Sequence, residues 1–148
     1  MKAAVYPRYG PPDVVQIKDV EKPVPLDHEI LIRVRAAALN PLDLTMKGQP
    51  YILRMMTGLR KPKDTRLGID VAGKVEAVGR NVTRFKPGDE VFGSCRGSFA
   101  DYACAAESRF AMKPENLTFE QAASVPVAAI TALQGLRDKG HIAPGQKS

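Results

Sequence analysis

Residues 67–91 read LGIDVAGKVEAVGRNVTRFKPGDEV, and this stretch decides the fold class. Apolar or small residues recur at alternate positions from Val71 to Ala77, which predicts a strand with one buried face. Arg80-Asn81 is typical of a tight turn. Pro87-Gly88 predicts a type II turn, because proline fixes the first φ and glycine accepts the positive φ that follows. The stretch therefore predicts a strand, two turns and a second strand that begins at Glu90.

Further short strands are predicted on both sides of this stretch. They are residues 1–6, 14–20, 28–36, 90–93 and 98–103. Residues 28–36 give the clearest pattern, since Ile30, Ile32 and Val34 fall on one face of the strand. Asn40 and Pro41 then suit the N-cap and first position of a short helical segment that ends near residue 47. Many short strands separated by Gly and Pro predict a barrel or sandwich.

The pattern changes to helix at Thr118. Thr118 and Gln121 have the spacing of a capping box, in which each side chain bonds the other residue's backbone N–H. A short helix is predicted there, and Pro126 breaks or restarts it. Residues 127–139 are rich in Ala and Leu and predict a second helix, with Gly140 as its C-terminal cap. The chain thus divides into residues 1–117 and residues 118–148.

Composition excludes several classes of partner. The net charge is +6, but the basic residues are mostly scattered, Trp is absent, and no aromatics interleave with them, so nucleic-acid binding is not expected. No run approaches the ~20 apolar residues of a membrane span, and residues 1–7 lack the apolar core of a signal peptide. We therefore expect no membrane partner and a cytoplasmic location. One basic cluster is a solvated loop or the border of an active-site mouth that attracts anions: Arg54, Arg60, Lys61, Lys63 and Arg66.

The two cysteines are expected to be free thiols, because a disulfide is rare in the cytoplasm. Cys104 lies in an apolar strand pattern and suits a small buried side chain. Cys95 lies in a more loop-like context, where Arg96 could lower the pKa of its thiol.

The motif Gly68-x-Asp70-x-x-Gly73 is not a dinucleotide fingerprint, because Asp70 replaces the middle glycine and strands are predicted on both sides. With residues 85–91 and 97–102 following in the same order, the chain resembles the N-terminal catalytic domain of the medium-chain dehydrogenase/reductase superfamily. The resemblance implies a mainly β fold with a few helices, a GroES-like, partly open β-barrel over residues 1–117. Residues 118–148 would be a helical connector to a nucleotide-binding Rossmann domain. We accordingly expect a truncated N-terminal fragment that is inactive alone.

Zinc-dependent members of this superfamily hold their catalytic metal with Cys, His and Cys. The resemblance places Asn40 at the first Cys and Ile69 at the His, and neither side chain is a zinc ligand. The remaining soft ligands do not supply a four-ligand cluster: Cys95, Cys104, His28 and His141. No metal site is therefore expected. This pattern resembles the zinc-independent quinone oxidoreductase-like branch, in which NADPH or NADH transfers a hydride to a quinone, an enone or a related carbonyl compound.

The resemblance also implies the site residues. The catalytic candidates are Asn40, Asp43 and Tyr51, and the cofactor-binding candidates are Asn40, Ser124, Val125, Pro126 and Thr131. Each has a structural alternative. Asn40 could cap a helix, Asp43 could complement a helix dipole, Tyr51 could pack, and Thr131 could bond its own helix.

Two other functions stay open at the level of sequence. One is a zinc-type alcohol dehydrogenase that uses other ligands. The other is a stand-alone GroES-like module that binds a partner, which would expose a contiguous apolar patch. For a full-length oxidoreductase the resemblance implies a small-molecule substrate and allows a homodimer, because dimers of the family commonly pair through the nucleotide-binding domain.

Overall fold

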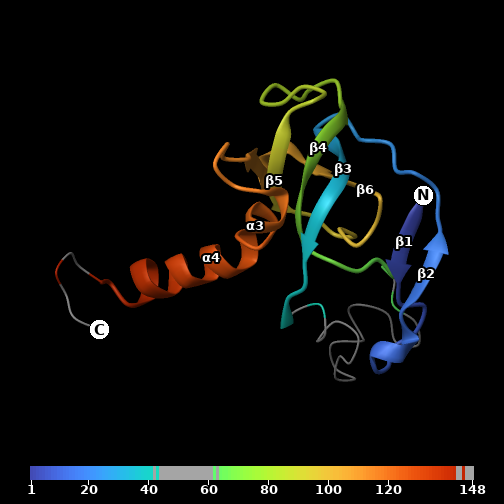
Figure 1. The fold of residues 1–148 in the computed structure, drawn as a ribbon, viewed down its shortest axis with the longest axis horizontal. Helices are drawn as coiled ribbons and strands as arrows, with labels where there is room; N and C mark the ends of the chain where they lie inside the picture. Colours follow the sequence, from blue (N-terminus) through green and yellow to red (C-terminus); the bar gives the residue numbers. More distant parts are fainter. Residues whose placement is uncertain (42, 44–61, 63, 143–144, 146–148) are drawn as a thin grey trace.

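A computed structural model describes residues 1–41, 43, 62, 64–142 and 145 of the chain (Figure 1). Five antiparallel strands form the main sheet in the order β6-β3-β4-β5-β7, and β1 pairs with β2 in a separate hairpin. The strands are β1 (Lys2–Val5), β2 (Gln16–Asp19), β3 (Glu29–Ala38), β4 (Asp70–Val78), β5 (Glu90–Ser94), β6 (Tyr102–Ala106) and β7 (Phe110–Met112). The helical elements are η1 (Pro12–Val14), η2 (Glu107–Arg109), α3 (Phe119–Ala123), α4 (Pro126–Leu133) and η3 (Gln134–Lys139). The predicted mainly β fold with a few helices is confirmed.

The largest core cluster lies against the central strands of the main sheet, and a smaller one forms where α3 packs on Ala72 through Ala122 and Ala123. The most buried members of the largest cluster come from the three central strands and include Ile30, Ile32, Val71 and Val91. The alternation predicted for residues 28–36 and 71–77 is confirmed only in part, because Leu31 and Ala72, which point to the opposite face, are buried as well. β3 and β4 pair along nearly their whole length, from Ile30 opposite Val78 to Ala38 opposite Asp70. This long pairing brings the end of β3 beside the start of β4.

The turn before β5 is the predicted type II turn. Asp89 donates its backbone N–H to the Lys86 carbonyl oxygen at 3.2 Å, and Gly88 has a φ of +96°. The positive φ is the reason for glycine at this position, because an L side chain would be strained there. The turn places Glu90 in register opposite Lys74.

The prediction of a strand over residues 98–103 is wrong in its position. β6 begins at Tyr102 and runs to Ala106, while residues 98–101 turn away to meet the N-terminal hairpin. Ala4 donates its backbone N–H to the Phe99 carbonyl oxygen at 2.8 Å, and Ala100 forms an isolated bridge with Ala3. These long-range bonds decide where the strand begins. The short strand β7, which pairs with β5, was not predicted.

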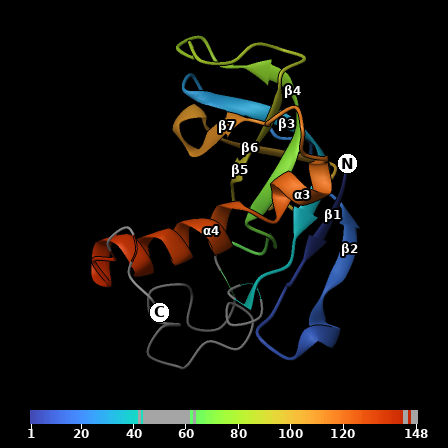
Figure 2. The same cartoon turned by 60° about the vertical axis from the view of Figure 1, so that its left-hand side comes forward.

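The helical segment follows the sequence closely. The capping box is confirmed, with Thr118 Oγ1 accepting from the Gln121 N–H at 3.2 Å and Gln121 Oε1 accepting from the Thr118 N–H at 3.0 Å. Pro126 starts α4, and the helix continues through η3 and extends away from the sheet, as Figures 1 and 2 show. Gly140 ends it as predicted, but with a right-handed φ of −79°. The left-handed residue is His141, at φ +47°.

Within the described part of the chain, no helix has the length and apolar character to cross a membrane.

Candidate active site

The candidate site begins where β3 ends and β4 starts. Ala38 pairs with Asp70, so Asn40, two residues beyond Ala38, lies beside the Asp70 carboxylate. The Asn40 side chain donates from Nδ2 to Asp70 Oδ2 at 3.0 Å. The two residues are far apart in the sequence, and the antiparallel ladder alone brings them together.

The same carboxylate caps α4. Val127, the second residue of the helix, donates its backbone N–H to Asp70 Oδ2 at 3.2 Å and to Oδ1 at 3.3 Å. Pro126 at the first position has no N–H, so Val127 carries one of the amides that a helix start leaves unpaired. A carboxylate there also complements the positive end of the helix dipole. Asp70 thus joins two elements, the end of β3 and the start of α4.

Burial dominates the electrostatics of Asp70, whose side chain is 0% exposed. Removal from water raises the pKa of its carboxyl, and the hydrogen bonds from Asn40 and Val127 oppose that rise. The charge on Asp43 raises the pKa of Asp70 further. The site therefore holds a carboxyl that accepts a proton more readily than an exposed aspartate does.

Asp43 makes a capping interaction. Its backbone N–H donates to the Asn40 carbonyl oxygen at 3.0 Å, and its Oδ2 accepts the Asn40 backbone N–H at 2.9 Å. This is one half of a capping box, with Asn40 at the N-cap and Asp43 three residues later. The side chain is 0% exposed, and its Oδ1 has no hydrogen-bond partner among the described residues.

The other predicted residues are arranged less tightly. Val125 and Pro126 line a hollow of about 340 Å³ together with residues of β5 and Phe110. Ser124 is exposed and donates its hydroxyl to the Gln121 carbonyl oxygen at 2.7 Å. Thr131 is exposed, and no hydrogen bond joins its hydroxyl to another described residue. Tyr51 lies outside the described residues.

The donor set does not fit a catalytic zinc. Ile69 stands between Gly68 and Asp70, and Asn40 bonds Asp70 through its nitrogen. No cluster of three or more His, Cys, Asp or Glu side chains suits a metal ion in the described ranges. A structural or catalytic zinc needs at least three such ligands, so we derive no step through a metal.

The burial of the two cysteines is the opposite of what we predicted from the sequence. Cys95 is fully buried, and burial raises the pKa of its thiol to about 12. The weak opposing effects come from Arg66 and Arg109, so the prediction that Arg96 lowers the pKa of Cys95 is wrong. Cys104 is only half-buried, and desolvation raises the pKa of its thiol to about 11. Both are free thiols that are poorly ionised at neutral pH.

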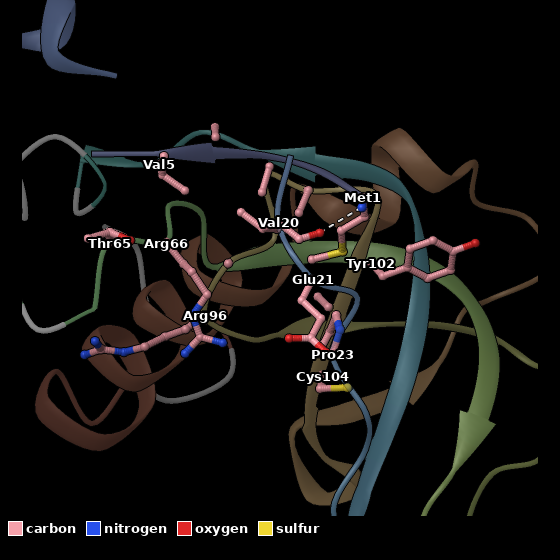
Figure 3. A pocket seen from close by; sticks show the side chains of 15 residues that line it. Met1, Val5, Val20, Glu21, Pro23, Thr65, Arg66, Arg96, Tyr102 and Cys104 are labelled. Carbon is pink, nitrogen blue, oxygen red and sulfur yellow. Dashed lines mark hydrogen bonds between the residues drawn. The ribbon is translucent and has the colours of Figure 1, made fainter. Parts of the chain in front are cut away.

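A separate cavity of about 260 Å³ lies beside β1 and β6, and Figure 3 shows its lining. Most of the wall is apolar, and Cys104 and Tyr102 contribute to it. Arg66 and Arg96 also line it, and both pair with Asp64, at 2.8 and 3.8 Å. Neither Asn40 nor Asp70 lines this cavity, so it is distinct from the candidate site.

Arg66 is the one member of the basic cluster that lies among the described residues. Its bidentate pairing with Asp64 holds the pKa of that carboxyl below its usual range and offsets the arginine charge. The other four members lie outside the described part of the chain.

Sequence reasoning did not single out the role of Asp70. Its partners, Asn40 and Val127, are 30 and 57 residues away, and only the folded chain brings them together. The sequence signal for this role is the position of Asp70 directly before the apolar run of β4. A carboxylate that is buried at the start of a strand requires hydrogen-bond partners.

Three comparisons place this arrangement among known proteins. The sequence pattern of the family described as Alcohol dehydrogenase GroES-like domain matches residues 26–115. A quinone oxidoreductase of Pongo abelii is 36% identical over 150 residues, which cover 99% of this chain and 44% of the relative. An NADPH-dependent alkenal/one oxidoreductase of Arabidopsis thaliana, a chloroplastic protein, is 37% identical over 147 residues, which cover 92% of this chain and 37% of the relative.

Solved structures agree. The quinone oxidoreductase from Coxiella burnetii superposes with a TM-score of 0.87 at 32% identity, covering 98% of this chain and 46% of that one. The chain thus spans less than half the length of the proteins it matches. The long β3–β4 ladder, the glycine-punctuated strands and these matches lead to one assignment. The chain belongs to the alcohol dehydrogenase GroES-like domain family, in the quinone oxidoreductase-like branch of the medium-chain dehydrogenase/reductase superfamily.

Proposed function

We propose that this chain forms the substrate-side domain of an NAD(P)H-dependent oxidoreductase, which reduces quinones, enones or related carbonyl compounds by hydride transfer without zinc. The observation that carries the proposal is the Asn40 amide held on Asp70 at the junction of β3, β4 and α4. In zinc-type members of the superfamily a metal would polarise the substrate from this place. Here a neutral hydrogen-bond donor would take that role. The relatives named for quinones and for alkenals and alkenones support the substrate class.

A nicotinamide cofactor fits the residues around the start of α4. Asn40 and the segment Ser124–Pro126 would hold the nicotinamide end, with Thr131 one turn further along the helix. When bound, the cofactor supplies the hydride. The NADPH dependence in the name of the Arabidopsis relative supports this choice of cofactor. We further assign residues 1–117 to the barrel and residues 118–148 to a helical connector, because α3 and α4 follow the last strand.

Asn40 is proposed to stabilise negative charge as it develops on the substrate oxygen. One N–H of its side chain donates to Asp70, and the other, which has no hydrogen-bond partner among the described residues, would donate to a ligand. A preorganised donor aimed at a developing oxyanion contributes about 2.7–4 kcal/mol to transition-state stabilisation. Val125 and Pro126 would provide an apolar wall that keeps water from the reacting atoms. Asp43 would act through the turn that carries Asn40 rather than on the substrate.

Kinetics of Asn40 variants test this function. In the natural-length protein that carries this chain, Asn40→Ala should lower kcat for NADPH-dependent quinone reduction by about 10²–10³-fold. Asn81→Ala is a matched control, because Asn81 is an exposed turn residue whose side-chain Nδ2 lies 3.5 Å from His28 Nε2. Equal kcat values for Asn40→Ala and Asn81→Ala would refute the role of the amide.

A further inference from the structure

We propose that Asp70 is a positioning residue, whose buried carboxylate holds the Asn40 amide and the first turn of α4 in one fixed arrangement. The inference rests on the proposed function, in which Asn40 is the donor to the substrate and α4 runs beside the cofactor. Asp70 is not among the residues proposed above to contact the substrate or the cofactor.

The first support is convergence. Asp70 receives hydrogen bonds from two donors that belong to different elements, Asn40 Nδ2 at 3.0 Å and the Val127 N–H at 3.2 Å. Both end on the same oxygen, Oδ2. Hydrogen bonds to a charged group are roughly twice as strong as those between neutral groups. A displacement of either donor would therefore cost the site energy.

The second support is chemical identity. An ionised carboxylate only accepts, so it requires the nitrogen of Asn40, not the oxygen, to face it. That choice fixes the rotation of the amide and leaves the second N–H and Oδ1 for other partners. An amide at position 70 would present its own N–H groups as well, and Asn40 would be able to turn over. The side-chain shape of Asp70 is thus less important than its lack of a donor.

The third support is the way α4 is attached. Beyond its first two residues this helix is exposed at every position, so the described chain holds it at its start, where Pro126 is buried and the Val127 N–H donates to Asp70. The Val127 amide is one that no carbonyl within the helix can satisfy. Asp70 therefore sets the distance between the proposed substrate donor and the proposed cofactor-side helix.

The test compares Asp70→Asn with Asp13→Asn in the natural-length protein. Asp13 is an exposed aspartate in η1, so the control makes the same chemical change without the bonds to Asn40 and Val127. We expect Asp70→Asn to lower kcat by about 10- to 100-fold with KM within about twofold of wild type, because misplacement of a reacting group by about 1 Å can cost 10²-fold. Wild-type kcat in Asp70→Asn would overturn the proposal.

A second readout does not depend on activity. In ¹⁵N spectra of the same proteins, Asp70→Asn should shift the Asn40 side-chain amide signals and speed hydrogen exchange at the Val127 amide, while Asp13→Asn should leave both unchanged. Unchanged Asn40 and Val127 signals in Asp70→Asn would overturn the proposal even if kcat falls. If Asn40→Ala proves fully active, the proposed function fails, and these spectra still decide whether Asp70 holds both groups.

A double variant separates positioning from simple structural support. Asn40→Asp with Asp70→Asn exchanges donor and acceptor, so the side-chain pair can form again while the amide leaves position 40. We expect thermal stability to recover relative to Asp70→Asn and kcat to stay low. Recovery of kcat together with stability would show that the pair acts only by supporting the fold, and would overturn the proposal.

Discussion

At the scale of single residues, burial and hydrogen bonding shift the pKa of Asp70 in opposite directions. Burying a carboxylate is costly, and hydrogen bonds from Asn40 and Val127 offset only part of that cost. The neighbouring Asp43 charge adds to it. The net result is a raised pKa, which means that the folded state disfavours the ionised form.

Stability should therefore depend on pH through Asp70. Below the ordinary pKa of 3.8 the carboxyl is protonated in both the folded and the unfolded state. As pH rises above that value the unfolded chain ionises first, so the wild type should lose stability relative to Asp70→Asn. The loss should stop once the pH passes the raised pKa of the folded carboxyl. Thermal unfolding of both proteins across this pH range measures the difference.

Asp13→Asn provides the reference curve for that series, because it removes a carboxyl at an exposed position. The difference in stability between Asp13→Asn and wild type should not vary with pH in the range where the difference between Asp70→Asn and wild type changes. A wild type that gained stability relative to Asp70→Asn with rising pH would mean that the pKa of Asp70 is lowered, against the account of its burial.

The cysteines offer a second test at this scale. Cys104 is more exposed and its thiol pKa of about 11 lies below the value of about 12 for Cys95. Iodoacetamide should modify Cys104 at least about tenfold faster than Cys95, since one pKa unit changes the thiolate population tenfold. Both rates should rise from pH 8 to pH 10. Peptide mass spectrometry measures each rate, and earlier labelling of Cys95 would contradict the burial pattern.

At the scale of elements, features encoded within a few residues were predicted well. The Lys86–Asp89 turn, the Thr118 capping box and the restart at Pro126 all depend on neighbours in the sequence. The start of β6 was placed wrongly because it depends on hydrogen bonds to β1, nearly a hundred residues away. β7 has three residues, too few to display an alternating pattern.

The capping box can be tested directly. Thr118→Ala removes the hydroxyl that accepts the Gln121 N–H, and should lower the free energy of unfolding by about 1 kcal/mol. Thr118→Ser retains the hydroxyl and should unfold close to wild type. Urea denaturation of the three proteins measures the differences, and equal losses for Ala and Ser would show that the hydroxyl does not act as a cap.

A glycine inside β4 is required by close packing. A Cβ added to Gly73 would collide with the Arg33 carbonyl oxygen and lie 2.7 Å from Ile32 Cγ2. Gly73→Ala should therefore destabilise the protein by about 1–3 kcal/mol, as overpacked sites do. Gly135→Ala is the matched control, because its added methyl group meets open space in a helix. Denaturant titration should show no loss for the control, and tolerance of Gly73→Ala would contradict the close β3–β4 approach.

At the scale of the whole molecule, the sequence pointed to two of the groups that meet at Asp70 but not to their contact with it. Asn40 and the start of α4 were named as candidates, and both do meet at Asp70. The junction itself was not foreseen, because it requires the β3–β4 register and the docking of a helix more than fifty residues later. Patterns of local sequence carry no information about such a three-way contact.

The exposed apolar residues of α4 and η3 also belong to this scale. Ile130, Leu133 and Leu136 are 54%, 52% and 54% exposed. Large apolar side chains left in water along one helix are typical of a docking face. Such a face suits a nucleotide-binding domain, as the proposed function requires, and it equally suits the partner of a binding module. Enzymatic activity separates these two readings.

The most direct test of the central claim is the rate of NADPH oxidation by the natural-length protein with a quinone, after chelation has removed bound metal and metal analysis has verified its removal. We predict that the metal-depleted protein retains its full rate and that added Zn²⁺ does not increase it, because the proposed function places Asn40 rather than a metal at the substrate oxygen. Activity that disappears on chelation and returns with Zn²⁺ would contradict it.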